Sequence, residues 1–563
     1  MKGIAVSSGI AIAQVFKFER PVLTIIRRSS EPVVEIERLQ EAIKISSEEI
    51  EGIKEKSAEK LSLEEQAIFD AHLALVNDPE LYTQVVHKIE VEQINAEYAV
   101  EEVANIFIHM FESLEDEYMR ARASDIKDVT YRVMAHLCGV RMADISLIDH
   151  EVILVAEELT PSDTAQLDKR YIKGFVTEQG GRTSHSAIMA RSIEIPAVVG
   201  VKEAMNMIEH GEMIILDAIE GNVIIAPSDT EIQEYTKKSI QVEEEKKELV
   251  SLIEEETVTL DGVHIELSAN IGNPKNMEAV IRNGADGVGL YRTEFLYMDA
   301  SELPSEEEQY QAYKAVLESI PDKRVVIRTL DIGGDKKLPY LNIPEEMNPF
   351  LGHRAVRLCL DRTDIFRTQL RALLRASVHG RLAIMFPMIA TLQELRDAKR
   401  LLNEEKESLL QEGYSISNTI EVGMMVEIPS AAVMADKFAK EVDFFSIGTN
   451  DLIQYAMAAD RMSDTVAYLY QPYHPSVLHL IKLTVDGAHK AGIWCGMCGE
   501  MAGEWKAVPL LVGLGLDEFS VVASGILPIR KIIRSLNKKE CEDIAARALA
   551  CSSSEEALEV LGG

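Results

Sequence analysis

The stretch VDFFSIGTNDL, residues 442–452, decides the fold of the C-terminal half. It begins as an apolar, aromatic run typical of a buried strand and ends in the polar Asn450 and Asp451. Seven other runs in the C-terminal half, five before this stretch and two after it, have nearly the same form: IELSANI, GVGLYRTEFL, RVVIRTLD, RLAIMFPMI, EVGMMVEI, IWCGMCGE and LDEFSVV. Mostly helical stretches separate them. Eight alternations of strand and helix predict a (β/α)8 barrel of the TIM type over residues 255–563.

The polar ends of these runs are expected to meet on one rim. In such barrels the carboxyl ends of the strands carry the chemistry. The polar residues at the ends of the runs are Arg292, Thr293, Glu294, Arg328, Asp331, Glu427, Asn450, Asp451, Cys498 and Glu500. Each alone could be an ordinary loop residue. Their recurrence at the same place in run after run favours a shared site.

The N-terminal half contains two kinds of sequence pattern. Residues 1–20 and 148–228 carry β-branched runs punctuated by Gly and Pro, which indicates one small α/β domain. Residues 21–147 repeat apolar positions at helical spacing, so we expect a helical subdomain inserted into that domain. Residues 229–254 are charged and free of Gly and Pro. They are read either as a solvated surface helix or as a helical linker.

Composition excludes several classes of partner. The 563 residues carry a formal net charge of -35, which disfavours nucleic acid and anionic membrane surfaces. The start of the chain shows no signal peptide, and no run is long enough to span a bilayer, so we expect no membrane insertion. Six cysteines do not form a disulfide framework, and a cytoplasmic location is the expectation.

The stretch GGRTSHSAIMARS, residues 180–192, points to a nucleophilic histidine. His185 stands at the start of a helical pattern that Thr183 or Ser184 can cap. The free N–H groups at the helix start would stabilise a phosphate on the imidazole, and Arg182 could add a charged hydrogen bond. A neutral imidazole is a competent nucleophile near pH 7. The alternative is a surface or capping histidine.

The barrel half supplies an arginine set and a carboxylate pair. The arginines are Arg292, Arg328, Arg354 and Arg461. Guanidinium groups bind carboxylate and phosphate through paired bonds, so this set indicates a small, doubly anionic substrate, or else salt bridges to acidic neighbours. Glu427 and Asp451 form a hard-oxygen pair that suits Mg²⁺, or they are partners of the arginines.

The stretch IWCGMCGE, residues 493–500, contains a C-x-x-C motif. In a thioredoxin-type protein such a motif opens a helix after a strand in a small fold of roughly 100 residues. Here it ends the seventh of eight strand-like runs, on the rim that carries the arginines. Its position therefore disfavours a redox centre formed by Cys495 and Cys498.

Taken together, these residues resemble enzyme I of the bacterial sugar phosphotransferase system, the phosphoenolpyruvate–protein phosphotransferases. The motifs that carry the resemblance run in order along nearly the whole chain: GIAVSSGIA, LTPSDTAQ, GGRTSHSAIMARS, GLYRTEFL, DIGGDK, NPFLGHRA, MVEIPS, FSIGTNDLIQY, YQPYHPSV, MCGEMAG and LGLDEFS. In the family, Thr often follows the histidine, where this chain has Ser186. Ser keeps the hydroxyl, so we expect a small effect.

The resemblance implies a reaction and its residues. Phosphoenolpyruvate would bind in the barrel with Mg²⁺, phosphorylate His185 and leave as pyruvate, after which His185 would phosphorylate the carrier HPr. The implied substrate-binding residues are Arg292, Arg328, Asn450, Asp451 and Arg461, with Arg354 and Lys336 in matching motifs. Glu427 and Asp451 would hold Mg²⁺, Thr164 would orient His185, and Cys498 would be the proton donor. The family is typically a homodimer through the barrel.

Three alternatives remain at this level. One is an enzyme similar to phosphoenolpyruvate synthase or pyruvate phosphate dikinase, which share the histidine and barrel motifs but also carry a large ATP-grasp domain. A second is a thiol–disulfide protein that uses Cys495 and Cys498. A third is a regulatory phosphoprotein without catalysis, against which the intact His185 and rim residues count.

Overall fold

The computed structural model divides the chain into two compact units, Met1–Glu245 and Lys246–Gly563. The residues that the structure describes are 1–57, 63–113, 117–140, 145, 148–164, 167–181, 184–192, 195–298, 300–334, 336, 338, 340–341, 344, 346–463 and 465–562. Because each unit has its own core, each is described by itself.

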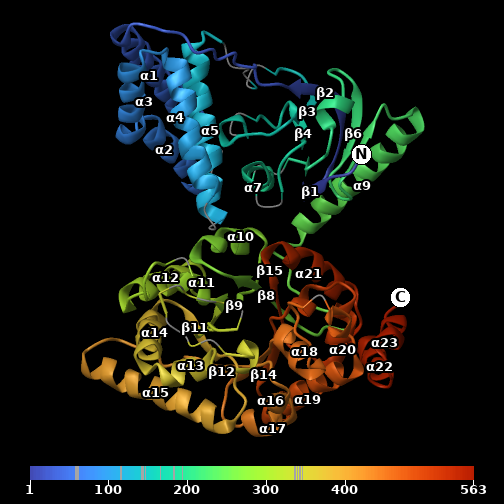
Figure 1. Cartoon of the computed structure of the whole chain (residues 1–563). Coiled ribbons are helices and arrows are strands. Elements are labelled where there is room, and N and C mark those ends of the chain that lie inside the picture. Colours follow the sequence, from blue (N-terminus) through green and yellow to red (C-terminus); the bar gives the residue numbers. More distant parts are fainter. Residues whose placement is uncertain are drawn as a thin grey trace. The chain divides into compact units, whose positions relative to one another are not determined.

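The second unit is a closed barrel of eight parallel strands (Figure 1). Its strands are β8 Glu266–Ile271, β9 Val288–Arg292, β10 Arg324–Arg328, β11 Arg381–Phe386, β12 Glu421–Val426, β13 Phe444–Ile447, β14 Trp494–Met497 and β15 Glu518–Val522. They pair in chain order, and β15 closes on β8. Parallel strands are buried on both faces, which is why they read as apolar runs in the sequence. The predicted (β/α)8 barrel is confirmed, and each predicted run contains one of its strands.

Helices surround the barrel. They are α10 Met277–Arg282, α11 Glu294–Met298, α12 Glu306–Ser319, α13 Val356–Asp361, α14 Thr363–Ala376, α15 Leu392–Gln411, α16 Pro429–Val433, α17 Ala435–Phe438, α18 Thr449–Met457, α19 Pro475–Ala491, α20 Ala507–Leu514, α21 Ile526–Ser535, α22 Lys538–Leu549 and α23 Ser554–Val560. Their apolar faces pack on the outer face of the strands and form the largest core of the molecule.

The barrel interior has a separate, small apolar core. It consists of Leu290, Val326, Ala383, Met385, Met425, Phe444 and Cys498, with Trp494 against it. Because side chains alternate along a strand, one set of strand residues faces this interior and the other faces the helices. The interior core lies beneath the carboxyl ends of the strands and supports the side chains there.

The first unit contains a seven-stranded sheet in the order β1-β5-β4-β3-β2-β6-β7. Its strands are β1 Ile4–Ser7, β2 Ile10–Phe18, β3 Val152–Ala156, β4 Ile172–Thr177, β5 Ala197–Val199, β6 Met213–Asp217 and β7 Asn222–Ile225. The central strands β2 to β5 are parallel, and β1, β6 and β7 are antiparallel to their neighbours. Strand β2, from the first 20 residues, thus pairs with β3, which begins only at Val152, after the helical subdomain.

Helices between β2 and β3 form a bundle with its own core beside the sheet (Figure 1). They are α1 Pro32–Ser57, α2 Leu63–Val76, α3 Pro79–Glu92, α4 Ala96–Glu112 and α5 Glu117–Leu137. The sheet itself carries α6 Pro161–Thr164, α7 His185–Ser192 and α8 Ala204–Met207. After the sheet comes α9 Asp229–Ser251, none of whose residues is buried. The boundary between the two units falls within α9.

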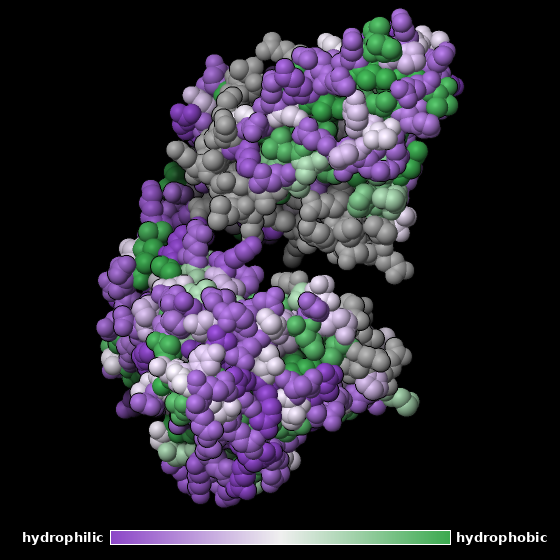
Figure 2. Space-filling view, turned by 90° about the vertical axis from the view of Figure 1, so that its left-hand side faces the viewer, coloured by the Kyte–Doolittle hydropathy of each residue, from purple (hydrophilic) through white to green (hydrophobic). Residues whose placement is uncertain are grey.

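One face of the protein, as far as the structure describes it, is largely hydrophilic (Figure 2). In Figure 2 the residues of both units on this face are mainly polar, with apolar residues in small scattered groups. Among the described residues, no helix has both the length and the apolar character needed to cross a membrane.

Candidate active site

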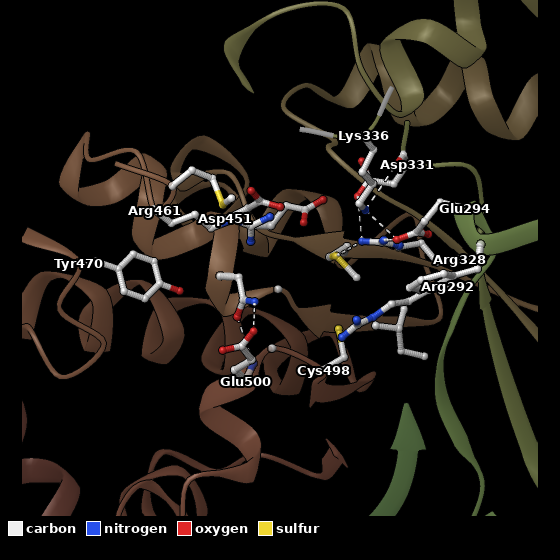
Figure 3. Close-up of a pocket in the computed structure, with 18 of the residues that line it drawn as sticks. Arg292, Glu294, Arg328, Asp331, Lys336, Asp451, Arg461, Tyr470, Cys498 and Glu500 are labelled. Atoms are coloured by element: carbon white, nitrogen blue, oxygen red, sulfur yellow. Dashed lines mark hydrogen bonds and ion pairs between the residues drawn. The ribbon is translucent and has the colours of Figure 1, made fainter. Parts of the chain in front are cut away.

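A cavity of about 550 Å³ opens at the carboxyl ends of the barrel strands. Charged residues dominate its lining: Arg292, Arg328, Lys336 and Arg461 are cationic, and Glu294, Asp331, Glu427, Asp451 and Glu500 are anionic. Figure 3 shows Arg292, Glu294, Arg328, Asp331 and Lys336 on one side of the cavity, and Asp451, Arg461 and Tyr470 on the other. A small ligand between them would contact charged groups from several strands.

Eight of the predicted barrel residues line this cavity. They are Arg292, Arg328, Lys336, Glu427, Asn450, Asp451, Arg461 and Cys498. They come together because each follows or ends a strand of the same closed barrel. Arg292 ends β9, Arg328 ends β10, and Asn450 and Asp451 lie in the first turn of α18, directly after β13.

Arg328 is held by two carboxylates. Its guanidinium lies 2.6 Å from Glu294 and 3.1 Å from Asp331, and all three side chains are buried. Lys336 Nζ shares Glu294 at 2.7 Å. Burial works to lower the pKa of Arg328, but Glu294 and Asp331 outweigh it and the pKa is raised. The guanidinium is therefore fixed in position and fully charged before any ligand arrives.

Arg354 does not line the cavity. It is buried behind the lining, with Nη2 3.0 Å from Asp331 and 3.4 Å from Asp451. Nη1 lies 3.3 Å from the hydroxyl of Tyr455. The predicted contact of Arg354 with substrate thus has no support in this geometry. Arg354 instead donates to both oxygens of each of these two lining carboxylates and so fixes their positions from behind the cavity wall.

Arg292 differs from Arg328. It lines the cavity and is partly exposed, and among the residues the structure describes no carboxylate lies within 4.0 Å of its guanidinium. Figure 3 shows Arg292 extending toward Cys498. A guanidinium that faces a cavity without a counter-ion is a ready binding group for a phosphate or carboxylate.

Glu427 and Asp451 are a carboxylate pair that a cation would suit. Glu427 is 1% exposed and accepts the backbone N–H of Met388 at 2.6 Å. Burial first, and then the charges of Asp451 and Asp331, raise the pKa of Glu427. Among the described residues no group of three or more His, Cys, Asp or Glu side chains forms a metal cage. The pair fits a hard divalent ion that takes its other ligands from substrate and water, as Mg²⁺ does.

Cys498 and Cys495 lie on opposite faces of the barrel wall. Cys498, just after β14, belongs to the interior core and lines the cavity, whereas Cys495 belongs to the outer core under the helices. All six cysteines are free thiols. A disulfide between the two would have to pass through the strand, so the thiol–disulfide alternative has no support. Burial raises the pKa of the Cys498 thiol to about 11, so it carries its proton at neutral pH.

The histidine segment lies in the first unit. His185 is the first residue of α7, and Ser184 caps the helix by accepting the N–H of Ala187 at 3.4 Å. The His185 side chain, Arg182 and Thr183 lie outside the described parts of the chain. Thr164 is buried at the end of α6, which packs against α7, and its hydroxyl donates to the carbonyl oxygen of Thr160 at 3.0 Å. The role of Thr164 toward His185 stays a prediction.

Three lining carboxylates, Glu294, Asp331 and Glu500, were expected on the rim from their place at strand ends but were given no individual role. Nothing in the sequence tells a ligand contact from a carboxylate that fixes an arginine. Glu500 pairs with Asn450 through two hydrogen bonds, at 3.0 and 3.1 Å. Tyr470 gave no signal beyond its place in the YQPYHPSV motif.

Comparisons with known proteins agree with this geometry. Three family models match successive parts of the chain: "PEP-utilising enzyme, N-terminal" over residues 2–122, "PEP-utilising enzyme, mobile domain" over 148–221, and "PEP-utilising enzyme, PEP-binding domain" over 246–538. The cavity lies entirely within the third match.

Full-length relatives share one name. A phosphoenolpyruvate-protein phosphotransferase of Geobacillus stearothermophilus is 58% identical over 98% of this chain and 96% of its own length. Proteins of the same name from Priestia megaterium and Bacillus subtilis (strain 168) are each 57% identical over 99% of this chain and 98% of their own length. A solution structure described as Enzyme I (nEIt) is 41% identical over 43% of this chain and 99% of its own, with a TM-score of 0.40.

Proposed function

This chain belongs to the phosphoenolpyruvate-protein phosphotransferases, and we propose that it transfers the phosphoryl group of phosphoenolpyruvate to His185 and then to a histidine of the carrier HPr. Pyruvate leaves after the first transfer. The reaction would be the first step of sugar uptake by the phosphotransferase system.

The observation that carries the proposal is the charge pattern of the barrel cavity. Phosphoenolpyruvate presents a phosphate and a carboxylate on a three-carbon frame. The cavity offers Arg292, which has no carboxylate partner among the residues that the structure describes, together with Arg328 and Lys336 held in place and Arg461 on the opposite side. Phosphoryl transfer needs fixed positive charge and in-line positioning more than covalent help, and this lining supplies both.

We propose Mg²⁺ as the cofactor, held by Glu427 and Asp451. When bound, the ion would neutralise charge on the phosphate oxygens and help to orient them. Among the described lining residues, five carboxyl groups face four cationic side chains, and a bound divalent ion would offset part of the negative charge that the substrate brings. Removal of divalent ions with EDTA should abolish labelling of the protein by phosphoenolpyruvate, and Mg²⁺ should restore it.

Cys498 is proposed as the proton donor to the product. As the phosphorus–oxygen bond breaks and a nitrogen–phosphorus bond forms on His185, the enolate of pyruvate is left in the cavity. The Cys498 S–H would transfer its proton to the enolate carbon, and the thiolate would regain a proton from solvent. The raised pKa of Cys498, set mainly by burial, keeps the proton on sulfur until the enolate forms.

The nucleophile and the substrate cavity lie in different units. His185 must therefore reach the barrel for the first transfer and the carrier for the second. The segment that bears it matches a model described as a mobile domain. We propose that this domain moves between the two partners, and that the helical subdomain of residues 21–147 docks HPr.

The acidic surface suits a carrier with a basic face. We further propose a homodimer formed through the barrel and a cytoplasmic location, which the six free thiols fit.

One labelling experiment tests the function. The protein is incubated with [³²P]phosphoenolpyruvate and Mg²⁺ without ATP, and the label is followed onto the protein and then onto HPr. We expect acid-labile label on His185, chased onto HPr, and none on a His185→Ala variant. Label that requires ATP would favour a dikinase-like enzyme. Labelling of the His185→Ala variant would show that another residue accepts the phosphoryl group.

A further inference from the structure

A buried charge cluster joins the helical subdomain to the turn that precedes the histidine helix. Its centre is Arg20, which follows β2 where the chain leaves the sheet for the helical subdomain. A single nitrogen, Nη2, lies 2.6 Å from Asp163, 2.9 Å from the hydroxyl of Thr160 and 3.2 Å from Asp128. Asp128 belongs to helix α5 of the bundle, whereas Thr160 and Asp163 belong to the sheet domain.

The sheet-domain side of the cluster is a tightly bonded turn. Asp163 accepts both the backbone N–H of Thr160 at 3.0 Å and its hydroxyl at 2.9 Å. The Thr160 carbonyl accepts the N–H and the hydroxyl of Thr164, each at 3.0 Å. Whatever holds Asp163 therefore also holds Thr164, at the end of α6, which packs against α7.

The helical side is equally fixed. Asp128 is 2% exposed, and its second oxygen lies 3.8 Å from His72, which is fully buried and also 3.3 Å from Asp125. Burial works to lower the pKa of Arg20, but Asp163 and Asp128 outweigh it and the pKa is raised. Removal of the guanidinium would leave two buried carboxylates, one in each part of the unit, facing each other.

A second contact joins the same two parts. Met189, one turn after His185 on α7, is 2% exposed and packs into the core of the helical bundle. The histidine helix is thus tied to the bundle directly by an apolar contact and indirectly, through α6, by the charge cluster. An apolar contact alone is tolerant of small rotations, whereas a guanidinium with three acceptors fixes direction.

We propose that Arg20 is a positioning residue for the second transfer: it fixes the Thr160–Thr164 turn, and with it α7, against the subdomain on which the carrier docks. The inference rests on the proposed function. Because Arg20 acts on alignment and not on docking, its loss should lower kcat for phosphorylation of HPr with little change in KM. Misplacement of a reacting group by about 1 Å can cost about a hundredfold in rate.

The test uses the full-length protein with phosphoenolpyruvate, Mg²⁺ and HPr, and measures both half-reactions in Arg20→Ala, Arg20→Lys and Arg170→Ala. Arg170 is the matched control, because it pairs with Asp168 on the surface of one part only. We expect Arg20→Ala to lower kcat toward HPr about a hundredfold. We expect KM for HPr and the rate of His185 labelling to stay within about threefold. Neither depends on alignment with the docked carrier, and the hydrogen bonds that Thr164 makes to the Thr160 carbonyl do not involve Arg20. Arg20→Lys should recover part of the loss, and Arg170→Ala should match the wild type.

Two results would overturn the positioning role. One is an unchanged kcat toward HPr in Arg20→Ala. The other is an equal loss in both half-reactions, which Arg20→Lys does not repair. If the wild type takes no label from phosphoenolpyruvate, the proposed function is wrong and this inference falls with it. A labelled wild type with an unaffected Arg20→Ala contradicts this inference alone.

Discussion

The two ends of the barrel differ in how their charged side chains are paired. At the carboxyl ends of the strands, charged side chains surround an open cavity, and Arg292 has no counter-ion among the described residues. At the amino ends of the strands, the floor of the barrel, charged residues begin strands and form ion pairs with one another. Arg324 lies 3.3 Å from Glu266 and 3.4 Å from Glu421, and stacks 4.1 Å over the ring of Trp494.

The difference separates binding from stability. The groups at the floor are bound to other protein groups: Trp494 donates a hydrogen bond to Glu421 at 2.9 Å and stacks on Phe444 with ring centroids 4.4 Å apart. The rim groups keep unused bonding capacity toward solvent. A substitution at the rim should therefore change activity more than stability, and one at the floor should change stability more than activity.

The largest effect is expected for Arg292→Ala. The variant should lose paired charged hydrogen bonds to the substrate, lowering kcat/KM for His185 labelling about a thousandfold, or roughly 4 kcal/mol. Because no described carboxylate loses an ion-pair partner, the melting temperature should stay within about 1 °C. Labelling kinetics and a thermal melt of the same sample check both halves. A large fall in melting temperature would mean that Arg292 is a structural residue, and it would contradict the proposed difference between rim and floor.

The second-largest effect is expected for Cys498→Ala. Loss of the proton donor should slow release of pyruvate about a hundredfold. Cys495→Ala is the matched control on the other face of β14, and it should keep normal turnover because its sulfur faces the helices. Pyruvate formation followed with a coupled assay distinguishes them. Equal turnover of the two variants would show that the proton comes from another group.

Arg324→Ala tests the floor. It removes a guanidinium that bridges two carboxylates and covers an aromatic ring, so we expect a loss of about 2 kcal/mol in unfolding free energy. For a domain of this size that corresponds to a fall of roughly 5 °C in melting temperature. The kcat/KM for phosphoenolpyruvate should stay within about threefold, as measured by His185 labelling. A large catalytic loss without a change in melting would reverse the assignment.

The smallest effect is expected for Glu518→Gln and depends on pH. Glu518, the first residue of β15, is buried, and burial first and then Glu266 raise its pKa to about 8. The folded protein therefore keeps Glu518 protonated where the unfolded chain ionises it. The protonated Glu518 therefore contributes its full share to the free energy of unfolding below pH 4.5, the pKa of the unfolded chain. That contribution is lost as the pH rises toward about 8, the pKa in the folded protein.

Glutamine stays neutral at every pH and should remove this loss. Relative to wild type, the Glu518→Gln melting temperature should improve by a few degrees between pH 5 and pH 8, where roughly 1 kcal/mol corresponds to 2–4 °C. Thermal melts at both pH values measure it. A difference between the two proteins that does not vary with pH would show that Glu518 is ionised in the folded state.

The sequence by itself determined the barrel and the membership of its rim. The eight apolar runs could be recognised because strands covered on both faces must be apolar along their length. The polar residues that end them, such as Arg328 and Asp451, had to meet, because closing a parallel barrel brings all carboxyl ends to one side. The place of Cys498 at the end of the seventh strand-like run also argued against a redox motif.

Only the tertiary structure decided what each rim residue contacts. Arg354 and Arg292 were both predicted to face the substrate, yet one is buried behind Asp331 and Asp451 and the other faces the cavity. The link from Arg20 to Asp163 spans 143 positions, and no local pattern records it. Periodicity reports which face of its own strand or helix a side chain occupies. The partner of a charged group comes from another element, so it is fixed only when the chain has folded.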